Sequence, residues 1–196
     1  DRAVYLGRKS LQKIPLTLLE RIENSYLNLT VRRHINARLG GRLKAFVSGG
    51  AALDPNIGYF FLALNIPILQ GYGQTEASPV ITANPPKKIK IETVGKLLVG
   101  VEAKLTKQGE ICVRGDLLMK GYWNDPIATK KKLRDGWLMT GDIGVIHPDG
   151  YISLTGRKKD IIINSGGDNI SPVKMETVLE AHPDIDQAMA FGHQHA

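Results

Sequence analysis

The chain has 196 residues, a formal net charge of +7 at pH 7 and 42% hydrophobic residues. This length is enough for one domain or two small domains with a buried core, and the composition is ordinary for a globular protein. No apolar run reaches the length of a membrane span, and the single cysteine, Cys112, excludes an internal disulfide. Because Cys112 lies in an alternating strand pattern, we interpret it as a small packing residue. We therefore expect a cytoplasmic protein, with peripheral membrane contact left open.

The positive charge does not by itself indicate a nucleic-acid partner. Lysines and arginines are scattered, the one short basic run is Lys130–Lys132, and aromatic residues make up only 6% of the chain. Proteins that bind single strands combine basic groups with aromatic rings on which bases stack. We therefore expect no nucleic-acid partner and interpret Lys130–Lys132 as a solvated helix face. Basic surface would also attract anionic lipid or polyanionic cofactors.

The chain begins with helical patterning. Hydrophobic residues recur at three- and four-residue spacing over residues 15–39, which predicts a helix with a break near Asn28 and Thr30. Gly40-Gly41 predicts the C-terminal end of this helix, because glycine adopts the left-handed conformation without a Cβ clash.

Two strand patterns follow, with a helix pattern between them. Strands are predicted over residues 43–47 and 66–69, and Asp54 is expected to cap a helix whose first residue is Pro55. Strands that alternate with helices are typical of a parallel sheet with crossover helices. The first part of the chain is therefore assigned to the α/β class.

The pattern changes after residue 84. Over residues 93–155 short strands are separated by glycine turns, which predicts a small antiparallel β unit interrupted by a helix near residues 126–133. A strand at residues 161–163, a helix capped by Ser171 and a final strand near residues 185–191 are predicted to follow.

These changes divide the chain into three predicted parts. Residues 1–84 would be part of an α/β parallel-sheet subdomain, residues 85–158 a β-rich subdomain, and residues 159–196 the start of a small C-terminal domain. One strand–helix–strand unit is too small to bury its own faces, so we expect the last part to continue beyond the chain.

The residue order Gly71–Glu76 marks a candidate nucleotide site directly after an apolar strand. The two glycines would let a ligand approach the backbone, and Tyr72 between them would stack on a base. Thr75 would donate a hydrogen bond to an α-phosphate oxygen, and Glu76 would offer the hard oxygen that Mg²⁺ prefers. The alternative is a glycine-rich turn with an exposed glutamate.

Three further segments have residue types that suit a nucleotide. Ser48–Ala51 ends another strand of the predicted sheet, where small residues would let a flat ligand lie against the backbone. Asp142 would accept both ribose hydroxyls, although a lone Asp is more often a turn former. Arg157 and Lys159 would reach a ribose or a phosphate, or would be solvated linker charges. The five histidines are dispersed and predict no metal cluster.

Taken together and in chain order, these segments resemble the AMP-forming, adenylate-producing superfamily of acyl-CoA synthetases, aryl-CoA ligases, peptide-synthetase adenylation domains and luciferases. Six stretches that span most of residues 48–172 carry the resemblance: Ser48–Ala51, Gly71–Glu76, Gly109–Gly115, Gly121–Pro126, Thr140–Asp142 and Gly156–Asp160. The segment Gly156–Pro172, and Asn84-Pro85-Pro86 leading to Thr93–Lys96, are most similar to the long-chain fatty acyl-CoA synthetases. The resemblance implies an α/β fold plus a small antiparallel β unit: the C-terminal part of the large domain of an acyl-adenylate synthetase and the start of its small α+β C-terminal domain.

The resemblance also implies a two-step ligase reaction that uses a fatty acid, ATP, Mg²⁺ and coenzyme A. The fatty-acid carboxylate attacks the α-phosphate of ATP to give an acyl-adenylate and pyrophosphate, and the thiol of coenzyme A then displaces AMP. The expected catalytic residues are Thr75 at the α-phosphate, Glu76 as the Mg²⁺ ligand and Lys159 as a hinge. Nucleotide contacts are expected from Gly49, Gly50, Ala51, Gln70, Gly71, Tyr72, Gly73, Thr75, Asp142 and Arg157.

Two elements of the family are missing from this sequence: the phosphate-binding loop, which lies upstream in the family, and a downstream lysine that helps to form the adenylate. We therefore expect the intact protein to be the enzyme and this chain alone to be inactive. Two alternatives stay open, an adenylating enzyme for aryl or amino acids and a non-catalytic nucleotide-binding homologue.

Overall fold

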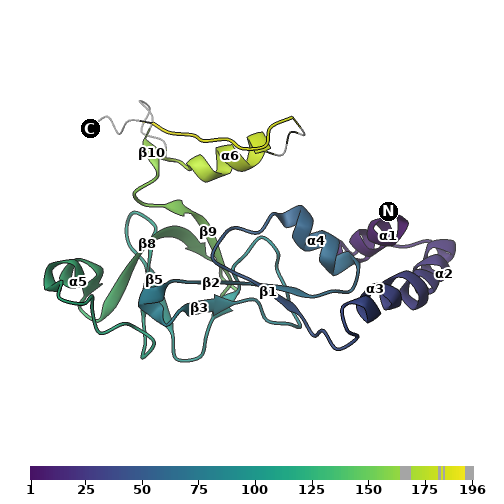
Figure 1. Ribbon diagram of the computed structural model, residues 1–196, viewed down its shortest axis with the longest axis horizontal. Helices are drawn as coiled ribbons and strands as arrows, with labels where there is room; N and C mark the ends of the chain where they lie inside the picture. The colour runs from purple at the N-terminus through teal and green to yellow at the C-terminus, as the bar shows by residue number, and fades with distance from the viewer. Residues whose placement is uncertain (164–168, 181, 183, 193–196) are drawn as a thin grey trace. The chain divides into compact units, whose positions relative to one another are not determined.

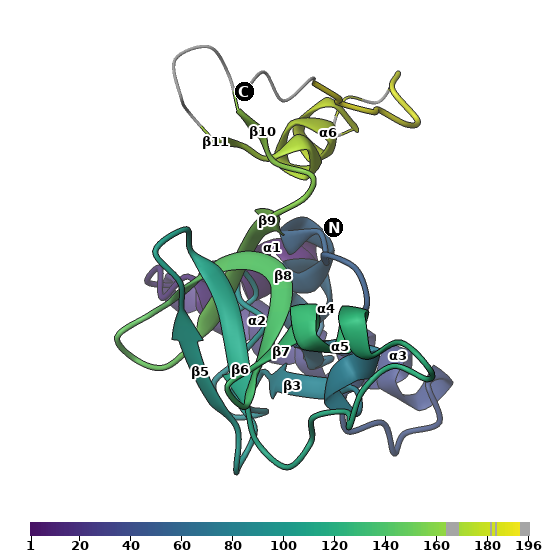
Figure 2. The ribbon, with the colours of Figure 1, turned by 90° about the vertical axis from the view of Figure 1, so that its left-hand side faces the viewer.

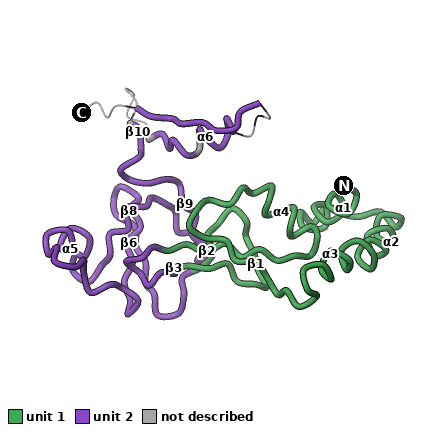
Figure 3. Tube along the Cα trace, in the orientation of Figure 1, with its two compact units in different colours: residues 1–73, 82–96 green, residues 74–81, 97–196 purple. Residues whose placement is uncertain are grey.

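The structure is a computed structural model of the chain, and it describes residues 1–163, 169–180, 182 and 184–192 (Figure 1). The chain forms two compact units (Figure 3). Unit 1 comprises residues 1–73 and 82–96, and unit 2 comprises residues 74–81 and the described residues from 97 onward.

Unit 1 contains a group of helices. They are α1 (Arg2–Leu11), α2 (Leu18–Leu27), a π-helical turn at Asn28–Arg32, α3 (Arg33–Arg38) and α4 (Pro55–Ala63). The π-helical turn interrupts the helix predicted over residues 15–39 at the expected place, where Thr30 Oγ1 donates to the carbonyl of Tyr26 at 2.8 Å. Gly40 and Gly41 both have positive φ after α3, which confirms the predicted helix end.

Unit 1 contains the predicted parallel pair of strands. Strands β1 (Phe46–Ser48) and β2 (Ile68–Gly73) run parallel, with Ser48 opposite Gln70, and α4 connects them. Asp54 caps α4 by accepting a hydrogen bond from the N–H of Asn56 at 2.7 Å, as predicted. The predicted bounds of β2 were wrong, because it extends through Gly73 rather than ending at residue 69. The sheet order is β1-β2-β3-β4, with β3 at Val80–Ala83 and β4 at Lys96–Leu97.

Two features hold unit 1 together. A hydrophobic cluster of Ala3, Leu64 and Ile66 is packed by surrounding side chains that include Phe46 and Phe61. Arg32, only 3% exposed, supplies the second feature. Its guanidinium donates to the carbonyls of Ala63 at 2.9 Å and Ala3 at 2.7 Å, and to Asn24 Oδ1 at 2.9 Å, so it joins α1, α2 and α4. Burial lowers the pKa of Arg32.

Unit 2 is built on a five-stranded antiparallel sheet, which confirms the predicted β unit (Figure 2). Its strands are β5 (Glu102–Leu105), β6 (Glu110–Arg114), β7 (Leu133–Arg134), β8 (Trp137–Ile146) and β9 (Ile152–Arg157). The order is β5-β6-β8-β7, and β9 pairs with β8. A 3₁₀ turn at Thr75–Ala77 and helix α5 (Pro126–Lys132) complete this part. Cys112 is buried in β6, as expected of a packing residue.

The end of the chain contains a β hairpin and a helix. Strands β10 (Ile162–Ile163) and β11 (Asn169–Ile170) pair antiparallel, and α6 spans Pro172–Glu180. The strand predicted near residues 185–191 was wrong, since residues 184–192 are described and contain no strand. Met189 and Phe191 are 80% and 77% exposed, so the apolar pattern here is not accompanied by burial. None of the helices in the described part of the chain is long and apolar enough to cross a membrane.

Candidate functional site

In unit 1, the carboxyl ends of β1 and β2 bring the predicted glycines together. A Cβ atom added to Gly49 would lie 3.4 Å from the carbonyl oxygen of Gly71, and one added to Gly71 would lie 3.0 Å from the carbonyl oxygen of Thr82. Gly50 has φ of +84°, a conformation that side chains disfavour. Close backbone approach therefore favours glycine at position 71 and the positive φ favours it at position 50, at the strand ends where ligands of open α/β sheets bind.

Gln70 and Tyr72 lie on the buried face of β2, whereas Gly71 and Gly73 lie on its half-buried face. Oriented by its hydrogen bonds, the Gln70 amide donates to the carbonyl of Thr93 at 2.9 Å and accepts from the N–H of Leu53 at 3.0 Å. Gln70 thus links β2 to the loop after β1. Its nucleotide contact and the stacking of Tyr72 on adenine stay predictions.

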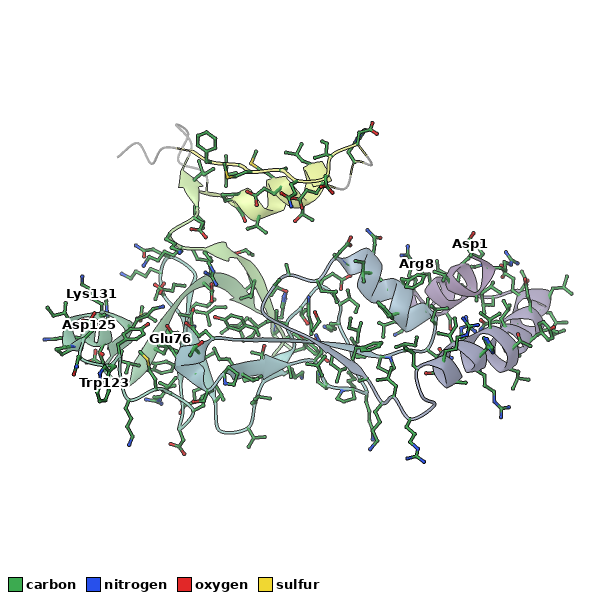
Figure 4. All side chains as sticks on the ribbon, viewed as in Figure 1. Asp1, Arg8, Glu76, Trp123, Asp125 and Lys131 are labelled. Atoms are coloured by element: carbon green, nitrogen blue, oxygen red, sulfur yellow. The ribbon has the colours of Figure 1, made fainter. Side chains whose placement is uncertain are left out.

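In unit 2, the short 3₁₀ turn carries Thr75, Glu76 and a fully buried Ala77. Figure 4 shows the position of Glu76. Thr75 is exposed and Glu76 is half-buried. The backbone carbonyl of Glu76 accepts from the N–H of Met119 at 2.9 Å, and its Oε1 accepts from the hydroxyl of Tyr122 at 2.6 Å. Both the main chain and the side chain of Glu76 are therefore fixed by the segment that precedes α5.

The Tyr122 hydrogen bond controls the ionisation of both partners. It lowers the pKa of the Glu76 carboxyl, and it raises the pKa of Tyr122 to about 12. Glu76 is therefore a carboxylate at neutral pH, and a carboxylate oxygen is a hard ligand. Tyr122 lies within the Gly121–Pro126 motif, but no role was predicted for it from the sequence, because its contact joins residues 46 positions apart.

The structure corrects the interpretation of one lysine. Lys130 and Lys131 are exposed, as expected of a solvated helix face, but Lys132 is half-buried. Its ammonium donates to the carbonyls of Met139 at 3.1 Å and Thr140 at 3.0 Å, and its charge helps to lower the pKa of Glu76. Lys132 thus joins the end of α5 to the strand that carries Asp142.

Asp142 and Arg157 are brought together as an ion pair on adjacent strands. They are opposite each other in the β8–β9 ladder, and Arg157 Nε lies 3.3 Å from Asp142 Oδ1. The Asp142 side chain is largely buried, whereas Arg157 is mostly exposed. Lys159 is exposed in the turn that follows β9. Its predicted role as a hinge stays a prediction.

The donor set of unit 2 is compatible with Mg²⁺ bound together with a phosphate. Among the described residues, no three His, Cys, Asp or Glu side chains gather into a potential metal site. Mg²⁺, however, is usually held by one or two carboxylates plus substrate phosphates rather than by an all-protein cage. An ionised, oriented Glu76 meets that requirement.

Comparison with known proteins identifies the family. The sequence profile of the AMP-binding enzyme family matches residues 14–123. The long-chain-fatty-acid–CoA ligase FadD15 of Mycobacterium bovis is 40% identical over 175 residues, which cover 89% of this chain and 29% of that protein. ATP-bound MatB from Rhodopseudomonas palustris is 34% identical with a TM-score of 0.68, over 78% of this chain and 33% of that one. The anthranilate CoA ligase AuaEII, solved with anthranoyl-AMP, is 29% identical with a TM-score of 0.64, over 72% of this chain and 29% of that one.

The solved structures of MatB and of the anthranilate CoA ligase thus share the fold of most of this chain. The chain belongs to the AMP-binding enzyme family, which confirms the resemblance drawn from its motifs. It spans 29% of the length of FadD15, so it corresponds to a segment of such a protein.

Proposed function

We propose that the protein to which this segment belongs is an AMP-forming long-chain fatty acid–CoA ligase. The observation that carries the proposal is the 40% identity to a long-chain-fatty-acid–CoA ligase across 89% of the chain. The Glu76 and Asp142 side chains support the proposal, because both residues belong to motifs that resemble those of the family. A fatty-acid substrate partitions into lipid, so a cytoplasmic enzyme with peripheral membrane contact would suit this reaction.

The proposed reaction proceeds in two displacements. The fatty-acid carboxylate attacks the α-phosphorus of ATP, and the bond to the β,γ-pyrophosphate breaks, which gives acyl-adenylate and pyrophosphate. The thiol of coenzyme A, after losing its proton, attacks the acyl carbonyl, and AMP leaves. ATP and coenzyme A are therefore co-substrates, and every atom of the thioester comes from the fatty acid and coenzyme A.

In this proposal the residues of unit 2 bind the phosphates and the ribose. The exposed hydroxyl of Thr75 would donate to the α-phosphate, and the carboxylate of Asp142 would accept the ribose hydroxyls with Arg157 beside it. Glu76 would hold Mg²⁺, which when bound offsets the negative charge of the phosphates. Tyr122 lowers the pKa of the Glu76 carboxyl and holds the carboxylate in one orientation for that purpose.

In unit 1 the strand ends would bind the base. Gly49, Gly50 and Ala51 would border adenine, and the residues from Gln70 to Gly73 would contribute backbone contacts and the Tyr72 ring. A side chain at position 71 would be tight, because its Cβ atom would lie 3.0 Å from the carbonyl oxygen of Thr82.

We also infer how the chain divides in the whole protein. Residues 1–84 and 85–158 would form the C-terminal part of the large domain, and residues 159–196 would begin the small domain. Lys159 would be the hinge about which the small domain turns between the two displacements.

The direct test is Glu76→Gln in the full-length protein, with pyrophosphate release measured in the presence of fatty acid, ATP and Mg²⁺. We expect adenylate formation to fall about 100-fold, because the amide has no charge with which to hold the metal. Glu92→Gln is the matched control, since Glu92 is an exposed glutamate that also accepts a hydrogen bond from a tyrosine, Tyr59. Unchanged activity in Glu76→Gln would refute the Mg²⁺ role.

A second candidate substrate class is favoured by one comparison. The anthranilate CoA ligase is similar in structure over 72% of this chain, so an aryl acid fits the same fold. A panel of fatty, aryl and amino acids, scored by pyrophosphate release, separates the two classes. If no acid of the panel causes pyrophosphate release, a non-catalytic nucleotide-binding homologue would be favoured.

A further inference from the structure

The buried carboxylate of Glu110 bonds the immediate neighbours of both members of the Asp142–Arg157 pair. Glu110 is the first residue of β6 and is only 4% exposed. Its Oε1 accepts from the N–H of Gly141 at 3.0 Å, and its Oε2 accepts from the ammonium of Lys158 at 3.0 Å. One side chain thus contacts the residue before Asp142 and the residue after Arg157.

The contact with Gly141 supports a bulge in β8. Cys112 pairs with Met139 and Glu110 pairs with Ile143, so two steps along β6 correspond to four steps along β8. Residues 140–142 thus lie opposite Ile111 alone and form a bulge in which Gly141 has φ of +80°. Bulges of this kind re-aim side chains next to active sites, and this one carries Asp142.

The contact with Lys158 ties the end of β9 to the same bulge. The N–H of Lys158 donates to the carbonyl of Gly141 at 2.8 Å, while its ammonium reaches Glu110. The glutamate side chain is 5% exposed and the lysine side chain 47% exposed, so the carboxylate is the buried partner of the pair. Removal of the lysine contact therefore leaves a buried carboxylate without its countercharge.

We propose that Glu110 is a positioning residue of the ligase. It holds the bulge that presents Asp142, and it anchors Lys158, which directly precedes Lys159, to that bulge. The inference rests on the proposed function, in which Asp142 binds the ribose and Lys159 is the hinge. Glu110 would then give the ribose-binding carboxylate and the hinge a common anchor.

Two substitutions separate the contacts of Glu110. In Glu110→Gln, the amide oxygen still accepts from Gly141, but the amide nitrogen cannot accept from Lys158. In Glu110→Ala, both contacts are lost. Glu102→Gln is the matched control, because Glu102 forms a 2.6 Å ion pair with Arg114 on the same sheet but in an exposed position.

Amide hydrogen exchange tests the anchor without requiring activity. In Glu110→Gln we expect exchange at residues 158–161 to rise about tenfold while residues 140–142 stay within about twofold, as for loss of one hydrogen bond. In Glu110→Ala we expect both segments to exchange about tenfold faster. Exchange in either variant that matches Glu102→Gln would overturn the anchor.

Kinetics of the full-length protein test the consequence for the reaction. Glu110→Ala should raise the KM for ATP about tenfold, because the bulge that presents Asp142 loses its support. In Glu110→Gln, two rates are compared: thioester formation from added acyl-adenylate, and adenylate formation. The ratio of these two rates should change by about threefold or more. Equal loss in both half-reactions would indicate a structural role only and would overturn the inference. Wild-type protein without acid-dependent pyrophosphate release would instead refute the proposed function, and the exchange experiment would still decide whether Glu110 is the anchor.

Discussion

The hydroxyl of Tyr122 donates to Oε1 of Glu76 at 2.6 Å, which fixes the carboxylate of the 3₁₀ turn to the segment that leads into α5. Tyr122 is itself held, since its N–H donates to Thr129 Oγ1 at 2.9 Å on that helix. A hydrogen bond to a charged acceptor stabilises a folded protein by about 1.5–3 kcal/mol. The orientation of Glu76 therefore depends on a residue 46 positions away in the sequence.

Tyr122→Phe should both weaken Mg²⁺ binding and lower the stability of unit 2. It removes the hydroxyl while keeping the ring, so Glu76 stays charged but loses its orientation. We expect the half-saturating Mg²⁺ concentration for adenylate formation to rise about tenfold, as for partners that orient metal ligands. The free energy of unfolding should fall by about 1.5 kcal/mol, measured with urea through Trp123 and Trp137, which both lie in unit 2.

Tyr59→Phe is the control for this prediction. Tyr59 also donates to a glutamate, Glu92, and its pKa is likewise raised to about 12, but this pair lies in unit 1. The Mg²⁺ requirement should be unchanged in Tyr59→Phe. An equal rise in both variants would mean that the effect does not pass through Glu76.

The sequence allowed the local features of this fold to be predicted, and the long-range contacts escaped prediction. The Asp54 cap and the glycine end of α3 depend on residues within one helical turn, so the pattern is sufficient to locate them. The parallel β1–β2 pair follows from the strand–helix–strand order. The Tyr122–Glu76 bond depends on how separate elements pack, which periodicity does not encode.

Lys132 and residues 185–191 illustrate two ways in which pattern reasoning fails. A run of three lysines predicts solvent exposure, but α5 ends beside β8, and the third lysine turns toward two carbonyl groups there. An apolar run at residues 185–191 predicts a strand, yet a strand requires a partner with which to pair its backbone. The predicted site residues Asp142 and Arg157 were placed in separate motifs, and only the β8–β9 register makes them neighbours.

Lys132→Met should destabilise unit 2, whereas Lys131→Met should not. The first substitution keeps the aliphatic stem but leaves the carbonyls of Met139 and Thr140 without this donor. We expect a loss of about 1–3 kcal/mol in the free energy of unfolding, measured by tryptophan fluorescence in urea. Lys131 projects from α5 into solvent, so its substitution should change stability by less than about 0.5 kcal/mol (Figure 4). Equal effects of the two substitutions would contradict the contacts of Lys132.

Glu20→Gln should change how the stability of unit 1 depends on pH. Glu20 accepts from Lys9 Nζ at 2.7 Å and from the N–H of Thr17 at 2.9 Å, and the Lys9 contact is the main reason that the pKa of Glu20 is lowered. A lowered folded-state pKa contributes stability that is present above the ordinary value of 4.5 and is lost as the pH falls through the folded value. In Glu20→Gln the neutral amide can still accept the hydrogen bond from Thr17 that caps the helix, but it does not titrate, so this dependence of stability on pH is lost.

The measurement compares the urea midpoints of wild type and Glu20→Gln by circular dichroism at pH 7 and pH 3. The wild type should be more stable at pH 7, and the difference should shrink at pH 3. Glu23→Gln removes the more exposed ion pair with Arg2, and its effect on the urea midpoint at the two pH values is compared with that of Glu20→Gln. A difference that persists at pH 3 would show that the charge of Glu20 is not its source.

Gly95→Ala should lower the free energy of unfolding far more than Gly100→Ala, although both substitutions impose a similar cost on the backbone conformation. Gly95 and Gly100 both have positive φ, +88° and +82°, so alanine costs about 1–2 kcal/mol at either position from the backbone alone. A Cβ atom at Gly95 would lie 2.0–2.2 Å from the backbone of Ala83 and Asn84, whereas nothing lies within 4 Å of one at Gly100. Backbone atoms cannot move aside as a flexible side chain does, so we expect Gly95→Ala to cost at least about 3 kcal/mol more than Gly100→Ala. Hydrogen exchange of the β2 amides checks this, because β2 should lose protection in Gly95→Ala and retain it in Gly100→Ala; similar protection in the two variants would contradict the close approach at Ala83.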